Sequence, residues 1–109
     1  MSAGDLNVTS RTNDDHVEIS VTGEIDLANA SAFEEHLANA ITNHAVEVCV
    51  DLSGVEFIDS AGMRALVALA YRLQTAQIRL HLHAPDGSLA RRVLMLSGLE
   101  SLIHPDADR

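Results

Sequence analysis

The hexapeptide FIDSAG, residues 57–62, places an acid and a hydroxyl side by side between two apolar stretches. A β-branched apolar run precedes it and a run with helical spacing follows it, so Asp59 and Ser60 are expected where a helix begins. The first turn of a helix has backbone N–H groups without intrahelical partners and carries a partial positive charge. An acid and a hydroxyl at that position have two interpretations, one structural and one functional.

In the structural interpretation, Asp59 or Ser60 caps the helix by accepting hydrogen bonds from the unpaired N–H groups, which contributes about 1 kcal/mol. In the functional interpretation, the hydroxyl is a phosphate acceptor, because the helix N-terminus would stabilise the dianion. The added charge would then change the affinity of this surface for a partner without unfolding the domain. Gly62, which has no side chain, would let another protein's active site approach the backbone closely.

Other reactive residues offer weaker alternatives. His81 and His83 share one face of a predicted strand, a spacing that can hold a metal, but no third ligand is evident. A serine hydrolase at Ser60 would need an activating His and acid, and FIDSAG is not the G-x-S-x-G turn of such enzymes. Asp51 resembles the phospho-acceptor of a receiver domain, but a receiver site also has a lysine, and the chain contains none. We interpret Asp51 instead as a strand-end cap. We therefore predict no metal, no cofactor and no enzymatic activity.

Composition limits the class of protein. The chain has 109 residues, of which 47% are hydrophobic, and this length suits one domain. The formal net charge is −9, with 16 acids against 7 arginines, which argues against binding to nucleic acid or to an anionic membrane. Neither a signal peptide nor an apolar run of about 18 residues is present, so a cytoplasmic protein is expected. The single cysteine, Cys49, is expected to be a small core residue.

Hydrophobic periodicity predicts the strands that position FIDSAG. An alternation of apolar and polar residues indicates strands with one buried face, and the RTNDD segment between the first two suits a hairpin turn. The more continuously apolar third segment is typical of a central strand, with SGVEFID as a short connection after it. The predicted strands are residues 6–10, 16–26, 46–52 and 78–84, with a possible final strand at 99–103.

Three amphipathic segments predict helices. The first, residues 29–42, begins at Asn29 or at a capping box formed by Ser31 and Glu34. The second, residues 60–74, has a wider apolar stripe and is expected to be more buried. The third is capped by Ser88 and ends near Gly98, and its expected inward face is formed by Leu89, Val93 and Leu96.

The order β-β-α-β-α-β-α, with a possible last strand, predicts one α/β domain. We expect a mixed sheet of four to five strands with helices packed on it and right-handed crossovers between the parallel strands. The domain is predicted to span residues 1–109, with a core of about 5–104 and a polar tail at 105–109.

Three stretches resemble the STAS domain of the anti-sigma factor antagonist family: GEIDLANA (23–30), VDLSGVEFIDSAGMRAL (50–66) and LSGLESLI (96–103). Their order and spacing match the family along nearly the full length, and the D-S-x-G step is the most specific part. The resemblance implies that Ser60 is the phosphorylation site and that Asp26 lies near it at the same end of the sheet. The partner-binding residues that it implies are Glu24, Asp26, Ile58, Asp59, Ser60, Gly62, Met63 and Arg64.

What the resemblance implies about function is a switch between partners. The unphosphorylated protein would bind an anti-sigma factor with a histidine-kinase-like ATPase fold, and the sigma factor would be released. That anti-sigma factor would also be the serine kinase for Ser60, and a PP2C-type phosphatase would reverse the modification.

Two positions depart from the family pattern. Ala61 replaces the Ser or Thr of many members, which leaves Ser60 as the only hydroxyl in the step. Arg64 replaces a frequent glycine and would project beside a phosphate. The alternative function is a STAS module that is not phosphorylated, either a scaffold or the soluble subunit of a lipid-transport system.

Overall fold

The computed structural model describes residues 5–102, so the predictions for Ile103, His104 and the tail at 105–109 lie outside the described residues. The elements, in chain order, are β1 (Leu6–Asn13), β2 (His16–Ile25), α1 (Ala30–Ala40), β3 (Glu47–Ile58), α2 (Ser60–Thr75), β4 (Arg79–His83), α3 (Leu89–Leu96) and the 3-10 helix η1 (Glu100–Leu102).

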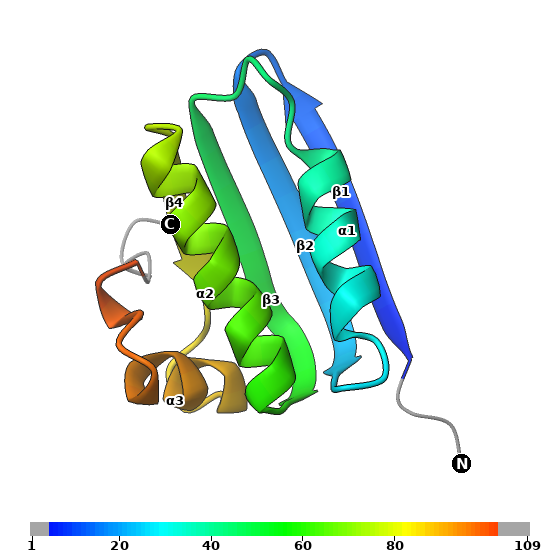
Figure 1. Ribbon diagram of the computed structural model, residues 1–109. Helices are drawn as coiled ribbons and strands as arrows, with labels where there is room; N and C mark the ends of the chain where they lie inside the picture. The colour runs from blue at the N-terminus through cyan, green and yellow to red at the C-terminus, as the bar shows by residue number, and fades with distance from the viewer. Residues whose placement is uncertain (1–4, 103–109) are drawn as a thin grey trace.

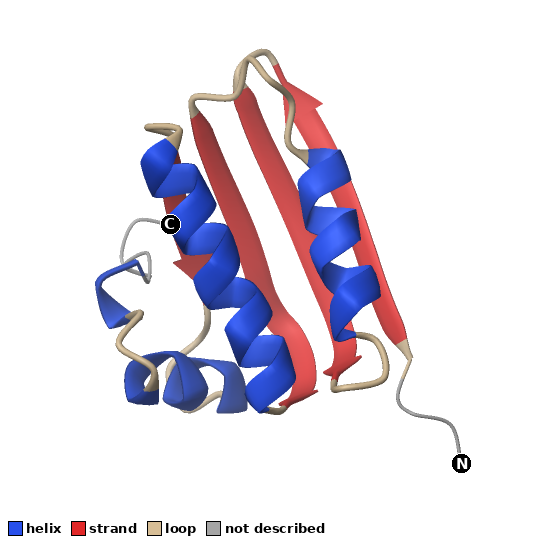
Figure 2. Cartoon of the chain, in the orientation of Figure 1, coloured by secondary structure: helices blue, strands red, loops and turns tan. Residues whose placement is uncertain are grey.

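The sheet has the strand order β1-β2-β3-β4. β1 and β2 form an antiparallel hairpin, whereas β2, β3 and β4 run parallel, which confirms the predicted mixed sheet with four strands. α1 and α2 lie side by side over one face of the sheet, and α3 lies at the end where α2 begins (Figures 1 and 2). The predicted single α/β domain is therefore confirmed over the described residues.

The core lies between the sheet and the two helices that cover it. Every second residue points inward in the first part of β2 and of β3, because side chains alternate between the two faces of a strand, and irregularities in the pairing interrupt this alternation toward the strand ends. α1 contributes Phe33 and Leu37 to the core, and α2 contributes five buried residues, so α2 is the more buried helix, as its wider apolar stripe predicts. The largest fully buried side chains are Phe33, Ile19, Ile25, Leu37, Leu52, Leu66, Leu82, Leu94, Val17, Val21, Val48 and Val50.

β3 is longer than the sequence predicts. The segment expected to be a connection, SGVEFID, instead continues the strand to Ile58. Gly54 permits this extension beside β2, since a β-carbon there would lie 2.6 Å from Thr22 Cγ2. Asp51 accordingly lies inside β3 and does not cap its end, although its Oδ1 still accepts a hydrogen bond from the Ser53 N–H at 2.9 Å.

Cys49 also differs from its expected place. It lies on the outer face of β3 and is only partly buried, because its neighbours Val48 and Val50 occupy the inward positions. Burial first, and then the negative charges of Glu47 and Glu18, raise the pKa of the Cys49 thiol. A raised pKa disfavours the thiolate, which is the reactive form of a cysteine.

α3 presents a different face to the core than predicted. Ala90 and Leu94 are buried, and of the three residues predicted to face inward only Val93 packs against the core, while Leu96 is 80% exposed and Leu89 38% exposed. The helix has only eight residues with apolar side chains on two sides, so its periodicity cannot indicate which side turns inward. The observed rotation packs Ala90 and Leu94 into the core, and the Arg91 guanidinium donates to the carbonyl of Ala84, the residue after β4, at 2.9 Å.

The final strand predicted at 99–103 does not form within the described residues. Gly98, at φ +83°, ends α3 as expected, and the Leu99 N–H then donates back to the Leu94 carbonyl at 3.0 Å. This turn holds the chain against α3, so residues Glu100–Leu102 form a short 3-10 helix instead of adding to the sheet.

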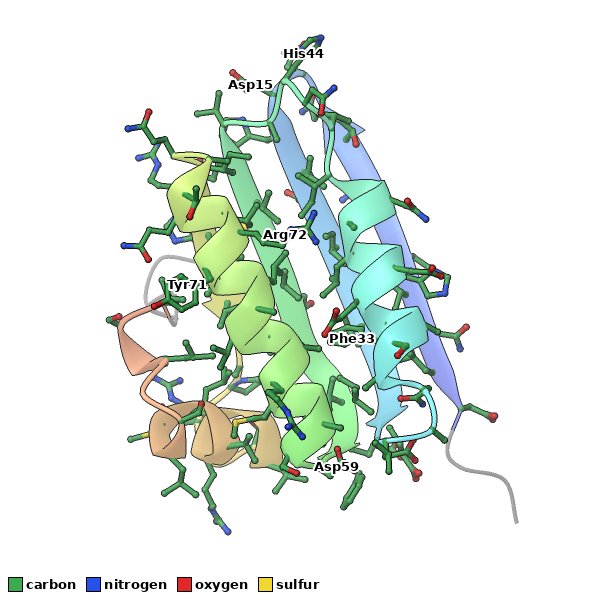
Figure 3. The ribbon with its side chains drawn as sticks, in the orientation of Figure 1. Asp15, Phe33, His44, Asp59, Tyr71 and Arg72 are labelled. Atoms are coloured by element: carbon green, nitrogen blue, oxygen red, sulfur yellow. The ribbon has the colours of Figure 1, made fainter. Side chains whose placement is uncertain are left out.

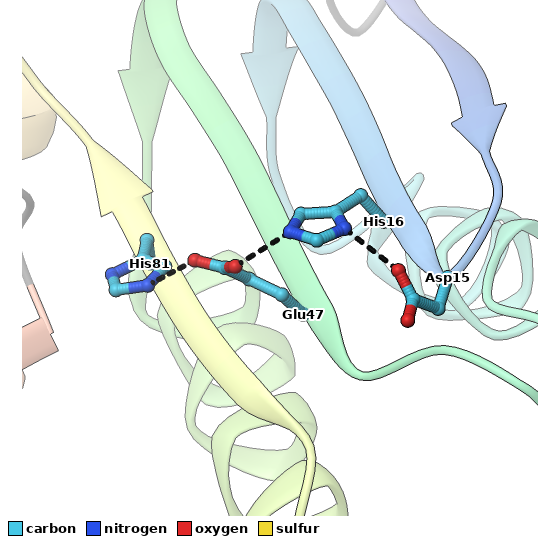
Figure 4. Close-up of polar contacts among 4 residues, drawn as sticks. All are labelled: Asp15, His16, Glu47 and His81. Atoms are coloured by element: carbon cyan, nitrogen blue, oxygen red, sulfur yellow. Dashed lines mark hydrogen bonds and ion pairs between the residues drawn. The ribbon is translucent and has the colours of Figure 1, made fainter.

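A row of polar side chains joins three strands on the face away from α1 and α2 (Figure 4). Glu47 of β3 contacts His16 Nε2 of β2 at 2.9 Å and His81 Nε2 of β4 at 2.6 Å, using one carboxylate oxygen for each. His16 Nδ1 also lies 2.9 Å from Asp15 Oδ1. His81 thus meets a carboxylate on the neighbouring strand, and no set of three potential ligands that could hold a metal occurs among residues 5–102.

This row predicts a pH dependence of stability. The hydrogen bond to Asp15 first, and then the charge of Glu47, raise the pKa of His16 above 6.5 against an opposing effect of burial. A raised pKa contributes stability that is fully present below the unfolded-state value and is lost as pH rises through the folded-state value. We expect denaturant unfolding to show a larger stability difference between wild type and His16→Gln at about pH 6 than at about pH 8. A difference that grows toward pH 8 would contradict this.

Candidate functional site

The parallel pairing of β2 and β3 builds the site at the carboxyl edge of the sheet. Ile25 and Ile58, the last residues of the two strands, are partners in the register. The Asp59 N–H donates to the Ile25 carbonyl at 3.1 Å. Asp26 and Asp59 therefore leave the sheet side by side, and Ser60 follows at once as the first residue of α2.

Asp59 is the residue that caps α2. Its Oδ1 accepts hydrogen bonds from the Ala61 N–H at 2.9 Å and the Gly62 N–H at 3.1 Å. Its Oδ2 accepts from the Leu27 N–H at 3.1 Å, which ties the loop after β2 to the start of α2. One carboxylate thus satisfies three backbone donors and holds the two halves of the site together; Asp59 is labelled in Figure 3.

Ser60 is exposed, and within the described part of the chain its hydroxyl makes no hydrogen bond. Because Asp59 already provides the cap, the Ser60 hydroxyl has no structural task at the helix start. This separates the two interpretations of FIDSAG, since the structural role belongs to Asp59. The hydroxyl remains available at the positive end of a helix, the environment that stabilises a phosphate.

The loop after β2 is held by its own side chains. Asp26 Oδ1 accepts from the Ala28 N–H at 3.0 Å and the Asn29 N–H at 3.3 Å. Asn29 Oδ1 accepts from the Asp26 N–H at 2.9 Å, and Asn29 Nδ2 donates to the Glu24 carbonyl at 2.9 Å. Asn29 occupies the N-cap position of α1, as predicted, but its side chain stabilises this loop and not the helix.

Gly62 and Ile58 lie beneath the site. A β-carbon at Gly62 would lie 2.6 Å from Ile25 Cγ2 and 2.9 Å from Ile58 Cγ1. Ile58 is only 6% exposed. Glycine is therefore required so that the first turn of α2 can pack against the strand ends, whereas the sequence suggested that it opens the backbone to a partner. Gly62 and Ile58 therefore support the site from beneath and are not part of its exposed surface.

The other expected site residues differ in burial. Met63, Glu24 and Asp26 are partly buried, and Arg64 is exposed. Arg64 stands four residues after Ser60, so the two side chains occupy the same face of α2.

Two apolar residues of this surface have no place in the sequence-based prediction. Leu27, in the loop after β2, is 79% exposed, and Phe57, near the end of β3, is 44% exposed. Large apolar side chains exposed around a polar centre mark protein-interaction surfaces. The signal for Leu27 was present in the sequence, because it is the apolar residue of a polar turn (D-L-A-N). Phe57 was assigned to a connection, so its exposure was not considered.

No helix of the described residues is long and apolar enough to cross a membrane. At the carboxyl edge of the sheet, Asp26 and Asp59 follow the paired strand ends Ile25 and Ile58, and the exposed Ser60 comes directly after Asp59. Such a site can bind a protein surface, and a phosphate on Ser60 would add charge to an end of the sheet that already carries two acids.

Residues 7–108 match the STAS domain family. The chain is 34% identical over 102 residues to "Anti-sigma-F factor antagonist RsfB" of Mycobacterium tuberculosis, which covers 92% of this chain and 81% of that protein. It is similar to a crystal structure of an anti-sigma factor antagonist from Mycobacterium paratuberculosis, with a TM-score of 0.79, 27% identity, and coverage of 95% of this chain and 89% of the other. The Bacillus cell fate determinant SpoIIAA in its phosphorylated form shares the fold, with a TM-score of 0.70, 19% identity and 95% coverage of both chains.

Proposed function

The chain belongs to the STAS domain family, among its anti-sigma factor antagonists, and we propose that it is a partner switch controlled by phosphorylation of Ser60. In its unphosphorylated form it binds an anti-sigma factor and so releases a sigma factor. It acts by binding and not by catalysis. The switch operates in the cytoplasm, where transcription takes place.

The observation that carries this proposal is the division of labour between Asp59 and Ser60. Asp59 accepts the three backbone hydrogen bonds of the helix start, and the Ser60 hydroxyl is exposed and makes none. A phosphate can therefore be added to Ser60 without breaking an internal contact. The same fold is found in SpoIIAA in its phosphorylated form, so this architecture accommodates a phosphate.

The kinase in this proposal is the anti-sigma factor itself, with a histidine-kinase-like ATPase fold. It transfers the γ-phosphoryl group of ATP to Ser60 Oγ, the hydroxyl proton is lost, and ADP is the second product. A PP2C-type phosphatase hydrolyses the phosphoester and regenerates the binding form. The partner-facing surface comprises Glu24, Asp26, Asp59, Ser60, Met63 and Arg64, with Ile58 and Gly62 supporting it from below.

The direct test is phosphorylation followed by mass spectrometry. The purified chain is incubated with ATP and each purified histidine-kinase-like anti-sigma factor of the same genome, and the phosphate is mapped to a residue. We expect one phosphate, on Ser60, and none on Ser60→Ala. Ser53 and Ser31 serve as internal controls, because they are also exposed serines. Modification of another residue, or of none, would refute the proposal and favour a scaffold without a phosphoryl switch.

A further inference from the structure

The outward face of α3 is apolar although nothing in the described chain covers it. Leu96 is 80% exposed, Met95 52% and Leu89 38%. Leu89, Arg92 and Leu96 are spaced by three and four residues, so they form one stripe along the helix. The core holds the other side of the helix, through Ala90 and Leu94. A stripe of this kind on a soluble domain marks an interaction surface.

This stripe lies at the same end of the molecule as Ser60. α3 packs against β3, the strand that ends at Ile58, and lies at the end of the molecule where α2 begins (Figure 1). Asp59 marks this end, and Asp15 and His44 mark the opposite one (Figure 3). The exposed Leu27 and Phe57 belong to the same end, because they adjoin the loop and strand that Asp59 joins. The exposed apolar residues of α3 therefore lie at the same end of the molecule as Ser60, where one partner can reach both.

The size of the stripe indicates which kind of partner covers it. α3 has eight residues and is therefore about 12 Å long. Its outward face alone is far smaller than the roughly 800 Å² per partner that a stable protein interface buries. A second copy of the chain held only through α3 would not form a stable dimer. Joined to the surface around Ser60, however, the stripe becomes part of an interface of ordinary size.

We propose that the outward face of α3 is a second contact for the anti-sigma factor, separate from Ser60 and insensitive to its phosphorylation. This inference rests on the proposed function and adds a part of the interface to it. The complementary surface of the partner is apolar, with an acidic group opposite the exposed Arg92. Leu96 is the anchor of this contact, because it is the most exposed large apolar residue of α3.

The consequence is that phosphorylation weakens the complex in one part only. The charge on Ser60 repels the partner at the strand ends, whereas burial of Leu96 does not depend on that charge. The free-energy contributions of separate sites that share no contacts are additive. The phosphorylated protein therefore keeps a weak, α3-dependent affinity for its partner.

The test is a double-mutant cycle with purified full-length chain and anti-sigma factor. We expect Leu96→Ser to weaken binding by about tenfold, with the same factor in the wild-type and Ser60→Asp backgrounds. Val46→Ser is the matched control, because Val46 is 44% exposed but lies next to β3's first residue, at the opposite end. We expect it to bind like wild type. Circular dichroism and thermal unfolding verify that all the variants fold.

Each outcome separates this inference from the proposed function. If Leu96→Ser binds like wild type while Ser60→Asp does not, the α3 contact is refuted and the switch at Ser60 stands. If Leu96→Ser weakens binding and Ser60→Asp does not, the α3 contact is supported and the switch fails. If Leu96→Ser changes only the sedimentation of the chain alone, the stripe binds a second copy and the inference is overturned.

Discussion

Ser60→Asp is expected to weaken binding to the anti-sigma factor by more than a hundredfold. The new carboxylate would directly follow Asp59, and Asp26 leaves the neighbouring strand end, so it would add charge to an acidic part of the proposed docking surface. Like charges brought together at an interface cost several kcal/mol, and about 3 kcal/mol corresponds to a loss of more than a hundredfold. Isothermal titration calorimetry with the purified anti-sigma factor measures the difference in affinity.

The matched variant is Ser60→Ala, which should bind like wild type and resist phosphorylation. Its free energy of unfolding should also equal that of wild type, because the Ser60 hydroxyl makes no hydrogen bond in the described chain. Part of the Ser60→Asp effect should diminish at high salt, since exposed charges are screened. If Ser60→Asp and Ser60→Ala bind the anti-sigma factor with equal affinity, the proposed electrostatic switch is ruled out.

Asp59→Ala is expected to have the second largest effect, on both stability and binding. It removes the acceptor of three backbone N–H groups, those of Ala61, Gly62 and Leu27. A lost helix cap costs about 1 kcal/mol, and further donors left partly buried without partners raise the loss to about 2 kcal/mol. Chemical denaturation should show this loss. Because the loop and α2 are no longer joined, phosphorylation of Ser60 should slow as well.

Two controls distinguish the joining role of Asp59 from simple capping. Asp59→Asn keeps one oxygen for the helix N–H groups but replaces the other with an amide that cannot accept from Leu27, so an intermediate loss is expected. Ser88→Ala removes the cap of α3, where one N–H bond is lost, and should cost about 1 kcal/mol without affecting phosphorylation. If Asp59→Ala and Ser88→Ala behave alike in both measurements, Asp59 is only a cap.

The sequence predicts this site well because the site is local. Asp59, Ser60 and Gly62 lie within four consecutive residues, and the change from a strand pattern to a helical pattern occurs just before them. The polar pair is thus assigned to a helix start by short-range rules alone. The mixed sheet could also be predicted. The first two strands flank a turn, and helical segments separate the second, third and fourth strands, so few topologies are possible.

Other features depend on contacts between distant segments. The extension of β3 depends on Gly54 meeting Thr22 of another strand, and the inward face of α3 depends on how Ala90 and Leu94 pack into the core. A short helix with apolar residues on two sides can turn either side toward the core, and its periodicity is the same in both cases. The prediction for α3 was therefore wrong in orientation, and this error concealed the exposed stripe around Leu96.

By itself, the sequence determined that the chain is an acidic α/β domain with a hydroxyl at the start of its second helix. Periodicity, composition and a tight motif are properties of neighbouring residues, and they can be read along the chain. Only the tertiary structure decided that Asp59, besides capping α2, joins the loop after β2 to the helix start, because that bond reaches Leu27, 32 residues before Asp59. It also decided which apolar side chains remain exposed beside Ser60, since burial depends on what the rest of the chain covers.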